Sequence, residues 1–282
     1  MAEVLKGLPV AKEINEKTQA NIKVLKDAGI TPKLAILRVG EKGDDIYYEN
    51  AAVKKCLQLG IDVLQVHLED TVSQKKLEDE LETLNSDSSV HAILILRPLP
   101  SHLDDGRIAE LIDPKKDVDG ISPMSLYGVF AGENRGFVPC TARACMEMLK
   151  FYNIPVQGKK AVVIGRSLVI GKPAAMLLLK ENATVTVCHS RTEDIDDIIR
   201  SGDIVISCAG KIGMINEKCV RPGQVVIDVS MNTGSDGKMT GDADFDAVSQ
   251  IVEAITPVPG GVGTMTTAIM LNNVTHAAMA KI

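Results

Sequence analysis

Short apolar runs alternate with segments of helical periodicity along the whole chain. In the first half, the apolar runs are KLAILRV, IDVLQVHL and HAILIL. The segments before them have the spacing of helices, from Pro9 to Gly29, from Tyr48 to Leu59 and from Ser73 to Leu84. This alternation is typical of βαβ units with a mainly parallel sheet. The pattern therefore predicts an α/β protein.

A second series of apolar runs begins at Lys159, after the loop-rich segment PKKDVDG (Pro114–Gly120). It comprises KAVVIG, ATVTVCHS, DIVISCAG, QVVIDVS and IVEAITPVPGG, the pattern of a doubly wound nucleotide-binding domain. The last stretch, Thr264–Ile282, predicts a helix long enough to run back to the first domain. We therefore expect a first domain of residues 1–140 completed by 262–282, a Rossmann domain of 141–261, and a cleft between them.

Composition narrows the class of protein. The chain has 282 residues, of which 45% are hydrophobic, enough for roughly two domains of ordinary size. The net charge is −6 and the pI about 5.5, and no long basic run occurs. These features argue against a nucleic-acid surface or a membrane anchor and favour small-molecule partners.

The cysteines and the first residues indicate the compartment. The six cysteines form no C-x-x-C pair and no zinc spacing, so we interpret them as reduced packing residues and expect no metal site. The start, MAEVLKGLPVAKEINEK, contains acidic residues and resembles no signal or transit peptide, and no apolar run reaches the length of a membrane span. We expect a cytoplasmic protein.

The segment PVPGGVG, Pro257–Gly263, has two prolines and three glycines, which fix a backbone shape that no ordinary helix or strand needs. Glycine permits positive φ and close approach, and an X-Pro bond can be cis. A tight surface turn would explain these residues equally well. A second glycine-bearing loop favours the functional interpretation.

That second loop lies in AVVIGRSLVIGKPAAMLLLK, where an apolar strand is followed by Gly165–Gly171 and by Pro173 at a helix start. Such a turn points backbone N–H groups and a helix N-terminus at a phosphate. The spacing is not G-x-G-x-x-G, and a strand-to-helix turn without a ligand remains the alternative.

The end of the next strand bears on the choice of cofactor. An NAD-binding fold has Asp or Glu there to hold the ribose 2′-hydroxyl, but this chain has His189, Ser190 and Arg191. With Arg166 in the preceding loop, the chemistry suits a 2′-phosphate, so we predict NADP as the cofactor. His189 is interpreted as a capping or packing histidine.

Taken together, these landmarks resemble the methylenetetrahydrofolate dehydrogenase/methenyltetrahydrofolate cyclohydrolase family along almost the whole chain. The matching stretches, in the family's order, are VGEKGDDIYYENAAVKKCLQLGI, ILILRPLP, PKKDVDG, PCTARA, GRSLVIGKP, ATVTVCHSRT, PGQVVIDVS, GDADF and ITPVPGGVGTMT.

The resemblance implies a homodimer whose subunit has a folate-binding domain and an NADP-binding Rossmann domain. It implies that Tyr48 lies against the pterin and that Asp119 hydrogen-bonds it, and we take these two as the catalytic candidates. The segment beside the folate matches Pro257, Val258, Pro259, Gly260 and Gly261. The positions along the cofactor match Thr141, Gly165, Arg166, Ser167, Ser190, Gly210 and Thr266.

The chain departs from the family pattern at three places. The catalytic lysine four residues after the tyrosine is replaced by Ala52, and the active-site glutamine by Leu96. Lys54 is no simple substitute, because six residues advance about 240° around a helix and four only about 40°. Arg97 is adjacent to Leu96, but neighbouring strand residues face opposite sides. The family's DVG reads DVS, and Ser230 is expected to crowd the cofactor.

These departures separate the family's two reactions. Oxidation of 5,10-methylenetetrahydrofolate by hydride transfer requires no protein base, whereas hydrolysis of the methenyl cation requires proton handling. We therefore predict an NADP-dependent dehydrogenase with weak or absent cyclohydrolase activity. One alternative is a bifunctional enzyme in which Tyr48 works with Asp119 or Arg97. The other is a protein outside this chemistry, either a different NADP-linked dehydrogenase or a folate- or NADP-binding protein without catalysis.

Overall fold

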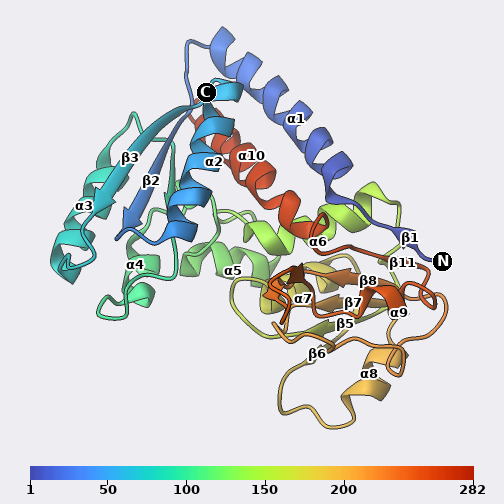
Figure 1. Cartoon of the computed structure of the whole chain (residues 1–282). Coiled ribbons are helices and arrows are strands. Elements are labelled where there is room, and N and C mark those ends of the chain that lie inside the picture. Colours follow the sequence, from blue (N-terminus) through green and yellow to red (C-terminus); the bar gives the residue numbers. More distant parts are fainter. The chain divides into compact units, whose positions relative to one another are not determined.

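The structure is a computed structural model that describes all residues from 1 to 282. The chain forms two compact units, one of Met1–Glu13 and Pro139–Ile269, the other of Ile14–Val138 and Met270–Ile282. We call them the large-sheet unit and the small-sheet unit, because their main sheets have six and three strands. Helices α1 (Gly7–Asp27) and α10 (Thr266–Met279) each begin in the large-sheet unit and end in the small-sheet unit (Figure 1).

The small-sheet unit is built on three parallel strands in the order β3-β2-β4. Central strand β2 is almost wholly buried, as expected for a parallel strand covered on both faces. Alternate β2 residues Ala35, Leu37 and Val39 pack with α3 and α4, while Arg38 reaches α2. The elements are β2 (Lys33–Val39), α2 (Gly43–Leu59), β3 (Asp62–Leu68), α3 (Gln74–Ser86), β4 (Ala92–Ile95), α4 (Asp105–Leu111) and α5 (Pro123–Ala131).

Part of the motif PKKDVDG serves the fold of this unit. The buried Lys116 ammonium donates to the carbonyl oxygens of Leu84 at 2.9 Å, Asn85 at 2.6 Å and Asp87 at 2.7 Å, at the end of α3. A lysine in this place satisfies carbonyls that the helix leaves unpaired. The buried Asp117 accepts hydrogen bonds from the amides of Ile121 and Ser122, which lead into α5.

The large-sheet unit has six parallel strands in the order β1-β11-β8-β7-β5-β6. Helices α8 and α9 pack on one face, where their residues join the core of Val162, Ile164, Val205 and Val226. The elements are β1 (Glu3–Val4), α6 (Cys140–Phe151), β5 (Lys160–Ile164), α7 (Gly171–Lys180), β6 (Thr184–Cys188), α8 (Ile195–Ser201), β7 (Ile204–Ser207), β8 (Val225–Asp228), β9 (Asn232–Thr233), β10 (Met239–Thr240), α9 (Phe245–Val248), β11 (Ala254–Ile255) and the 3₁₀ turn η1 (Val262–Thr264). The predicted α/β class with a doubly wound parallel sheet is confirmed.

The first residues lie in a different unit from the one expected, since the sequence placed them in the first domain. Glu3 pairs with Ala254 and Val4 with Ile255, so β1 extends the six-stranded sheet. The Gly7 amide also donates to the Gly260 carbonyl at 2.9 Å. Residues 1–13 therefore belong to the large-sheet unit, because these backbone hydrogen bonds tie them to the segment around β11.

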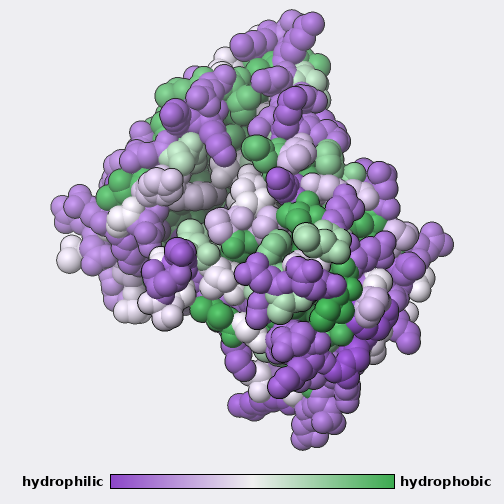
Figure 2. Space-filling model, turned by 45° about the vertical axis from the view of Figure 1, so that its right-hand side comes forward, coloured by the Kyte–Doolittle hydropathy of each residue, from purple (hydrophilic) through white to green (hydrophobic).

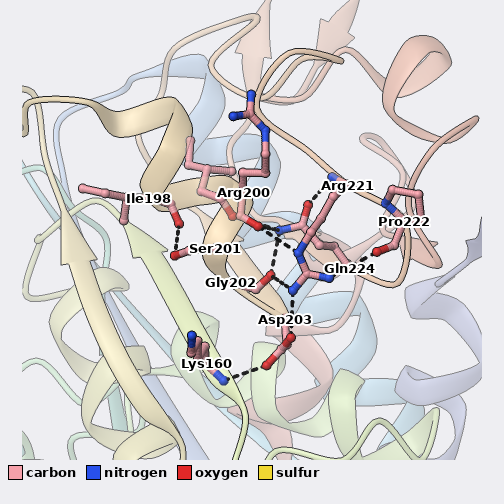
Figure 3. Close-up of polar contacts among 10 residues, drawn as sticks. Lys160, Ile198, Arg200, Ser201, Gly202, Asp203, Arg221, Pro222 and Gln224 are labelled. Carbon is pink, nitrogen blue, oxygen red and sulfur yellow. Dashed lines mark hydrogen bonds and ion pairs between the residues drawn. The ribbon is translucent and has the colours of Figure 1, made fainter.

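A polar cluster ties the end of α8 to the starts of three strands of the large sheet (Figure 3). The fully buried Gln224 donates to the carbonyls of Ile199 at 2.8 Å and Gly202 at 2.7 Å. Arg221 donates to the carbonyl of Gly202 at 3.0 Å and pairs with Asp203 at 2.9 Å. Asp203 also accepts the Lys160 amide at 3.0 Å. These contacts satisfy the carbonyls at the end of α8 and hold β5, β7 and β8 in a common register.

The face of the molecule seen in Figure 2 is mainly polar. Figure 2 shows hydrophilic side chains over most of the visible face, with hydrophobic residues in smaller groups. None of the helices combines the length and the apolar character needed to cross a membrane.

Candidate active site

The loop after β5 is shaped by two glycines that no other residue could replace. Gly165 has φ 122°, and a Cβ there would lie 2.6 Å from Cys208 Sγ. A Cβ on Gly171 would lie 2.1 Å from the Gly165 carbonyl oxygen. Between them, Ser167 Oγ accepts the Ile170 amide at 3.1 Å. The loop is thus folded back tightly onto the start of α7, and the positive end of a helix dipole favours an anion.

Three strands end at the same edge of the large sheet. Ile164, the last residue of β5, pairs with Cys188 of β6 and with Ser207 of β7. The predicted cofactor residues Gly165, Arg166 and Ser167 follow β5 directly. Ser190 follows β6 and Gly210 follows β7, so these five come together at the carboxyl ends of the strands. The chain order reverses between β5 and β7, and this is where open α/β sheets bind ligands.

The first four residues after β6, 189–192, contain no carboxylate that could hold a ribose hydroxyl. The backbone of this turn is closed by Thr192, whose Oγ1 accepts the His189 amide at 2.9 Å. His189 Nδ1 accepts the Arg191 amide at 3.2 Å. His189 therefore stabilises the turn, as interpreted from the sequence. Arg166, Ser190 and Arg191 are all exposed beside it.

The loop after β7, Ser207–Lys211, is organised by Asp242, which sequence reasoning missed. The buried Asp242 carboxylate accepts Ser207 Oγ at 2.7 Å, the Ala209 amide at 2.9 Å and the Lys211 amide at 2.7 Å. Burial alone raises the pKa of a carboxyl group, but hydrogen bonds from Ser207, Ser230 and Asn232 hold the pKa of Asp242 below its usual value. The motif GDADF, which contains Asp242, was the available signal.

Cys208 lies in this loop but is no candidate nucleophile. Its thiol donates to the Ile164 carbonyl at 3.1 Å, and burial raises the pKa of the thiol to about 12. A thiol with so high a pKa carries almost no thiolate at neutral pH. The six cysteines are all free, in agreement with their interpretation as reduced residues.

The proline- and glycine-rich segment forms one wall of a cavity of about 210 Å³ within the large-sheet unit. The peptide bond between Val258 and Pro259 is cis, and a Cβ on Gly261 would lie 2.5 Å from the Pro257 carbonyl oxygen. The cavity is lined by Asp228, Val229, Ser230, Met231, Met239 and residues 257–264, which include all five predicted folate-side residues, Pro257, Val258, Pro259, Gly260 and Gly261.

Asp228 is the ionisable group of this cavity. It is 2% exposed, and its carboxylate accepts the amides of Ala243 at 2.7 Å and Ser230 at 3.2 Å. Burial raises the pKa of Asp228 to about 6. A carboxyl group with this pKa gains and loses its proton just below neutral pH. The sequence of the apolar strand QVVIDVS did not indicate that the pKa of Asp228 is raised.

The remaining cofactor candidates begin two helices of the large-sheet unit. Thr141 is the second residue of α6, and its carbonyl accepts the Cys145 thiol at 3.4 Å. Thr266 is the first residue of α10, and its hydroxyl donates to the Gly263 carbonyl at 3.2 Å. Both are half-buried.

The two catalytic candidates, Tyr48 and Asp119, lie in the small-sheet unit and are half-buried. Tyr48 is in the first half of α2. The next residue, Glu49, is 2% exposed and fastens that half of the helix to the sheet. Its carboxylate contacts Arg38 Nε at 2.7 Å, Gln65 Nε2 at 2.9 Å and His67 Nε2 at 2.7 Å. The position of the Tyr48 backbone therefore depends on a buried charge cluster that the sequence did not reveal.

The positions that depart from the family pattern are closed to water. Ala52 is fully buried on the inner face of α2, and Leu96 is 7% exposed just after β4. Neither side chain can donate, accept or move a proton. Lys54 is exposed, as the helical geometry predicted.

Arg97 is engaged in an ion pair and does not suit a role as a base. Its Nε donates to Asp105 Oδ1 at 2.7 Å, and its Nη2 pairs with the other carboxylate oxygen. This contact raises the pKa of the Arg97 guanidinium further, and the charges of Asp119 and Asp117 add to the effect. The Arg97 guanidinium is therefore held as a cation beside Asp105.

No group of three or more His, Cys, Asp or Glu side chains has an arrangement that could hold a metal ion. The loop after β5 fits a dinucleotide, because it joins a strand to a helix start at the carboxyl edge of the sheet, where such folds bind pyrophosphate.

Comparison with known proteins agrees with this geometry. Residues 5–119 match the catalytic domain, and residues 139–282 the NAD(P)-binding domain, of tetrahydrofolate dehydrogenase/cyclohydrolase. A bifunctional protein FolD of Carboxydothermus hydrogenoformans is 48% identical over 279 residues, covering 98% of this chain and 97% of that protein. The predicted nicotinamide dinucleotide cofactor is thereby confirmed.

Two solved structures give the same result. The bifunctional FolD methylenetetrahydrofolate dehydrogenase/cyclohydrolase of Campylobacter jejuni has a TM-score of 0.97 and 39% identity over the whole of both chains. The FolD of Trypanosoma brucei, solved with NADP and an inhibitor, has a TM-score of 0.92 and 35% identity, covering 99% of this chain and 98% of that one. With both family domains, these relatives and the loops of the large sheet in agreement, the chain belongs to the tetrahydrofolate dehydrogenase/cyclohydrolase family.

Proposed function

We propose that this chain oxidises 5,10-methylenetetrahydrofolate to 5,10-methenyltetrahydrofolate with NADP as the hydride acceptor. The observation that carries the proposal is the common edge formed by the ends of β5, β6 and β7. This edge brings together Arg166, Ser190 and the loop Gly165–Gly171, in which two positions require glycine. No acid that would select NAD lies there. The Trypanosoma brucei relative, solved with NADP, supports the same cofactor.

In this proposal the large-sheet unit holds the cofactor. The backbone from Gly165 to Gly171 and the start of α7 bind the pyrophosphate, and Arg166 and Ser190 bind the 2′-phosphate. Ser167, Gly210, Thr141 and Thr266 complete the contacts along the dinucleotide. When bound, NADP supplies the nicotinamide carbon that accepts the hydride.

The folate side of the proposal uses Tyr48, Asp119 and residues 257–261. Residues 257–261 bind the substrate through a backbone whose shape requires glycine at Gly261 and has proline at two positions. Tyr48 lies against the pterin, and Asp119 accepts hydrogen bonds from it. Because the substrate's own nitrogens stabilise the developing cation, these groups need only orient the reacting carbon and exclude water.

The second candidate function is the bifunctional one, in which the same chain also hydrolyses the methenyl product. The names of the relatives favour this reading, since both FolD proteins of Carboxydothermus hydrogenoformans and Campylobacter jejuni are described as bifunctional. On the comparisons alone it has better support than a dehydrogenase without hydrolase activity. In this case Tyr48 and Asp119 would have to handle the proton, because Arg97 is held by Asp105.

The residues of this chain favour weak hydrolysis. Ala52 and Leu96 are buried and apolar where the family pattern has lysine and glutamine. General acid–base groups contribute about a hundred- to ten-thousandfold to a rate, so their loss is expected to be plain. We propose that the dehydrogenase reaction is intact and that hydrolysis is slower than in relatives with both groups.

One preparation assayed for both reactions tests these proposals. Reduced nicotinamide should appear when methylenetetrahydrofolate and NADP are added together. Decay of the methenyl chromophore, corrected for the spontaneous rate in buffer, should be slow. Rapid decay would support the bifunctional candidate instead. NADP binding without any reduced nicotinamide would indicate a binding protein without catalysis.

We further propose a cytoplasmic homodimer that binds neither nucleic acid nor membranes. The free cysteines support a reducing compartment, and the acidic composition argues against a nucleic-acid partner. Sedimentation equilibrium of the purified protein measures the oligomeric state, and a monomer at micromolar concentration would contradict the dimer.

A further inference from the structure

The amides of the loop after β7 all point to acceptors inside the large-sheet unit. The Cys208 amide donates to the Ile164 carbonyl at 2.8 Å. The amides of Ala209 and Lys211 donate to the Asp242 carboxylate at 2.9 and 2.7 Å. Asp242 thus gathers the loop around a buried negative charge, much as an anion gathers a nest of backbone amides. The Gly210 amide, which lies between these two in the chain, is not held by Asp242.

Ser230 supplies the acceptor for that amide. The Gly210 N–H donates to Ser230 Oγ at 3.1 Å, and Ser230 Oγ donates to Asp242 Oδ2 at 2.7 Å. A hydroxyl group has one proton and two lone pairs, so both bonds form at once. Ser230 is 8% exposed and also lines the cavity beside the proline- and glycine-rich segment. Its hydroxyl is turned toward Asp242 and Gly210, which changes the expectation that it simply crowds the cofactor.

The bond matters because of the conformation of Gly210. This residue has φ 66°, in the left-handed region, and it is exposed at the edge where β5, β6 and β7 end. The family pattern DVG has glycine in place of Ser230, so this chain has a hydrogen bond that the pattern lacks. Without the hydroxyl, the Gly210 amide would lose its protein acceptor and the loop one of its restraints.

We propose that Ser230 is a positioning residue that fixes Gly210 and thereby raises the affinity of the cofactor site. This inference rests on the proposed function, which assigns Gly210 to the NADP site. The residue added to the site is Ser230. Its hydroxyl contacts the loop that contains Gly210, and the family pattern has glycine at its position. A loop already fixed in its binding conformation loses less entropy when the ligand binds.

Ser207 provides a matched control within the same cluster. Its hydroxyl donates to the same Asp242 oxygen at the same 2.7 Å, but it makes no bond to Gly210. Ser230→Ala and Ser207→Ala each remove one donor from Asp242. Amide hydrogen exchange measured by NMR on the full chain without cofactor is the first readout. We expect the Gly210 amide to exchange at least tenfold faster in Ser230→Ala, and within about threefold of the parent rate in Ser207→Ala.

Cofactor binding is the second readout. Calorimetric titration with NADP should give a Kd raised about fivefold or more in Ser230→Ala and within about twofold in Ser207→Ala, a difference of at least about 0.5 kcal/mol between the variants. The KM for NADP should rise while kcat changes little, because the Ser230 hydroxyl is engaged by Gly210 and Asp242. Ser230→Thr, which keeps the hydroxyl, should restore both values.

Equal effects of the two alanine variants on the Gly210 amide and on NADP would overturn the proposal, since they would indicate a purely structural role through Asp242. An unchanged Gly210 amide in Ser230→Ala would overturn it as well. If Ser230→Ala does not fold, Ser230→Gly and Ser230→Thr allow the same comparison. The Gly210 amide should then exchange fast in Ser230→Gly and slowly in Ser230→Thr. If the parent binds no NADP, the proposed function fails, and amide exchange still decides whether Ser230 holds Gly210.

Discussion

Glu49 allows a direct test of how α2 is held on the small sheet. Glu49→Gln keeps the size of the side chain and removes its charge. In the parent protein the carboxylate is 2% exposed and bonds Arg38, Gln65 and His67. Arg38 is itself only 8% exposed, so the variant leaves a buried cation without its counter-ion.

The size of the effect follows from these contacts. Removing one partner of a buried ion pair costs about 3 to 5 kcal/mol. Part of this is recovered here, because Arg38 still donates to the Gly40 carbonyl and the His67 side chain, 47% exposed, can be hydrated. We therefore expect the free energy of unfolding to fall by about 2 to 3 kcal/mol, or roughly 30- to 150-fold in the folding equilibrium.

Urea unfolding followed by circular dichroism measures this loss. Asp79→Asn is the control, because Asp79 pairs with Lys75 on the exposed side of α3 and should cost less than about 0.5 kcal/mol. The double change Arg38→Met with Glu49→Leu should recover much of the stability, since it leaves no buried charge. A loss below about 0.5 kcal/mol in Glu49→Gln would refute the reasoning.

Three further predictions follow from other contacts. Arg166→Ala should weaken NADP about ten- to a hundredfold and NAD hardly at all in calorimetric titrations, because one charge-assisted bond to the 2′-phosphate is lost; equal losses for both cofactors would contradict this. Burial raises the pKa of Asp228 to about 6, above its usual 3.8, so its contribution to stability is present below pH 3.8 and lost as the pH rises through about 6. Asp228→Asn should remove that part of the pH dependence of urea unfolding, and an unchanged profile would argue against it. Gln224→Ala should lower the free energy of unfolding by about 1 to 3 kcal/mol, because the Arg221 amide loses its acceptor and the Ile199 and Gly202 carbonyls each lose one donor, whereas exposed Gln157→Ala should not.

The strands were predictable from the sequence where apolar residues run together. KAVVIG, ATVTVCHS, DIVISCAG and QVVIDVS became β5, β6, β7 and β8, because buried parallel strands need continuous apolar residues. Strand β1 was missed, since Glu3 and Val4 are two exposed residues without any periodicity. Its place is decided by pairing with β11, about 250 positions later, which no local pattern contains.

The site was predictable where chemistry depends on neighbouring residues. The loop from Gly165 to Gly171 and the missing acid after β6 could be identified from short segments. The polar clusters around Glu49 and Asp242 could not be identified from the sequence, because their residues come from separate strands and loops. A polar residue such as Arg38 within KLAILRV is ambiguous by itself, and only the fold shows that Glu49 lies opposite it.

The way the chain is divided has a consequence for its synthesis. The large sheet needs β1 from the first residues and β11 from beyond residue 250, while the small-sheet unit needs the last residues as well as the first half. Asn273, for example, donates to the Val118 carbonyl at 2.8 Å across 155 positions. Nascent domains generally fold in order from the N-terminus. In this protein almost the entire chain must emerge from the ribosome before either unit has all its residues. A truncated chain therefore contains neither unit complete.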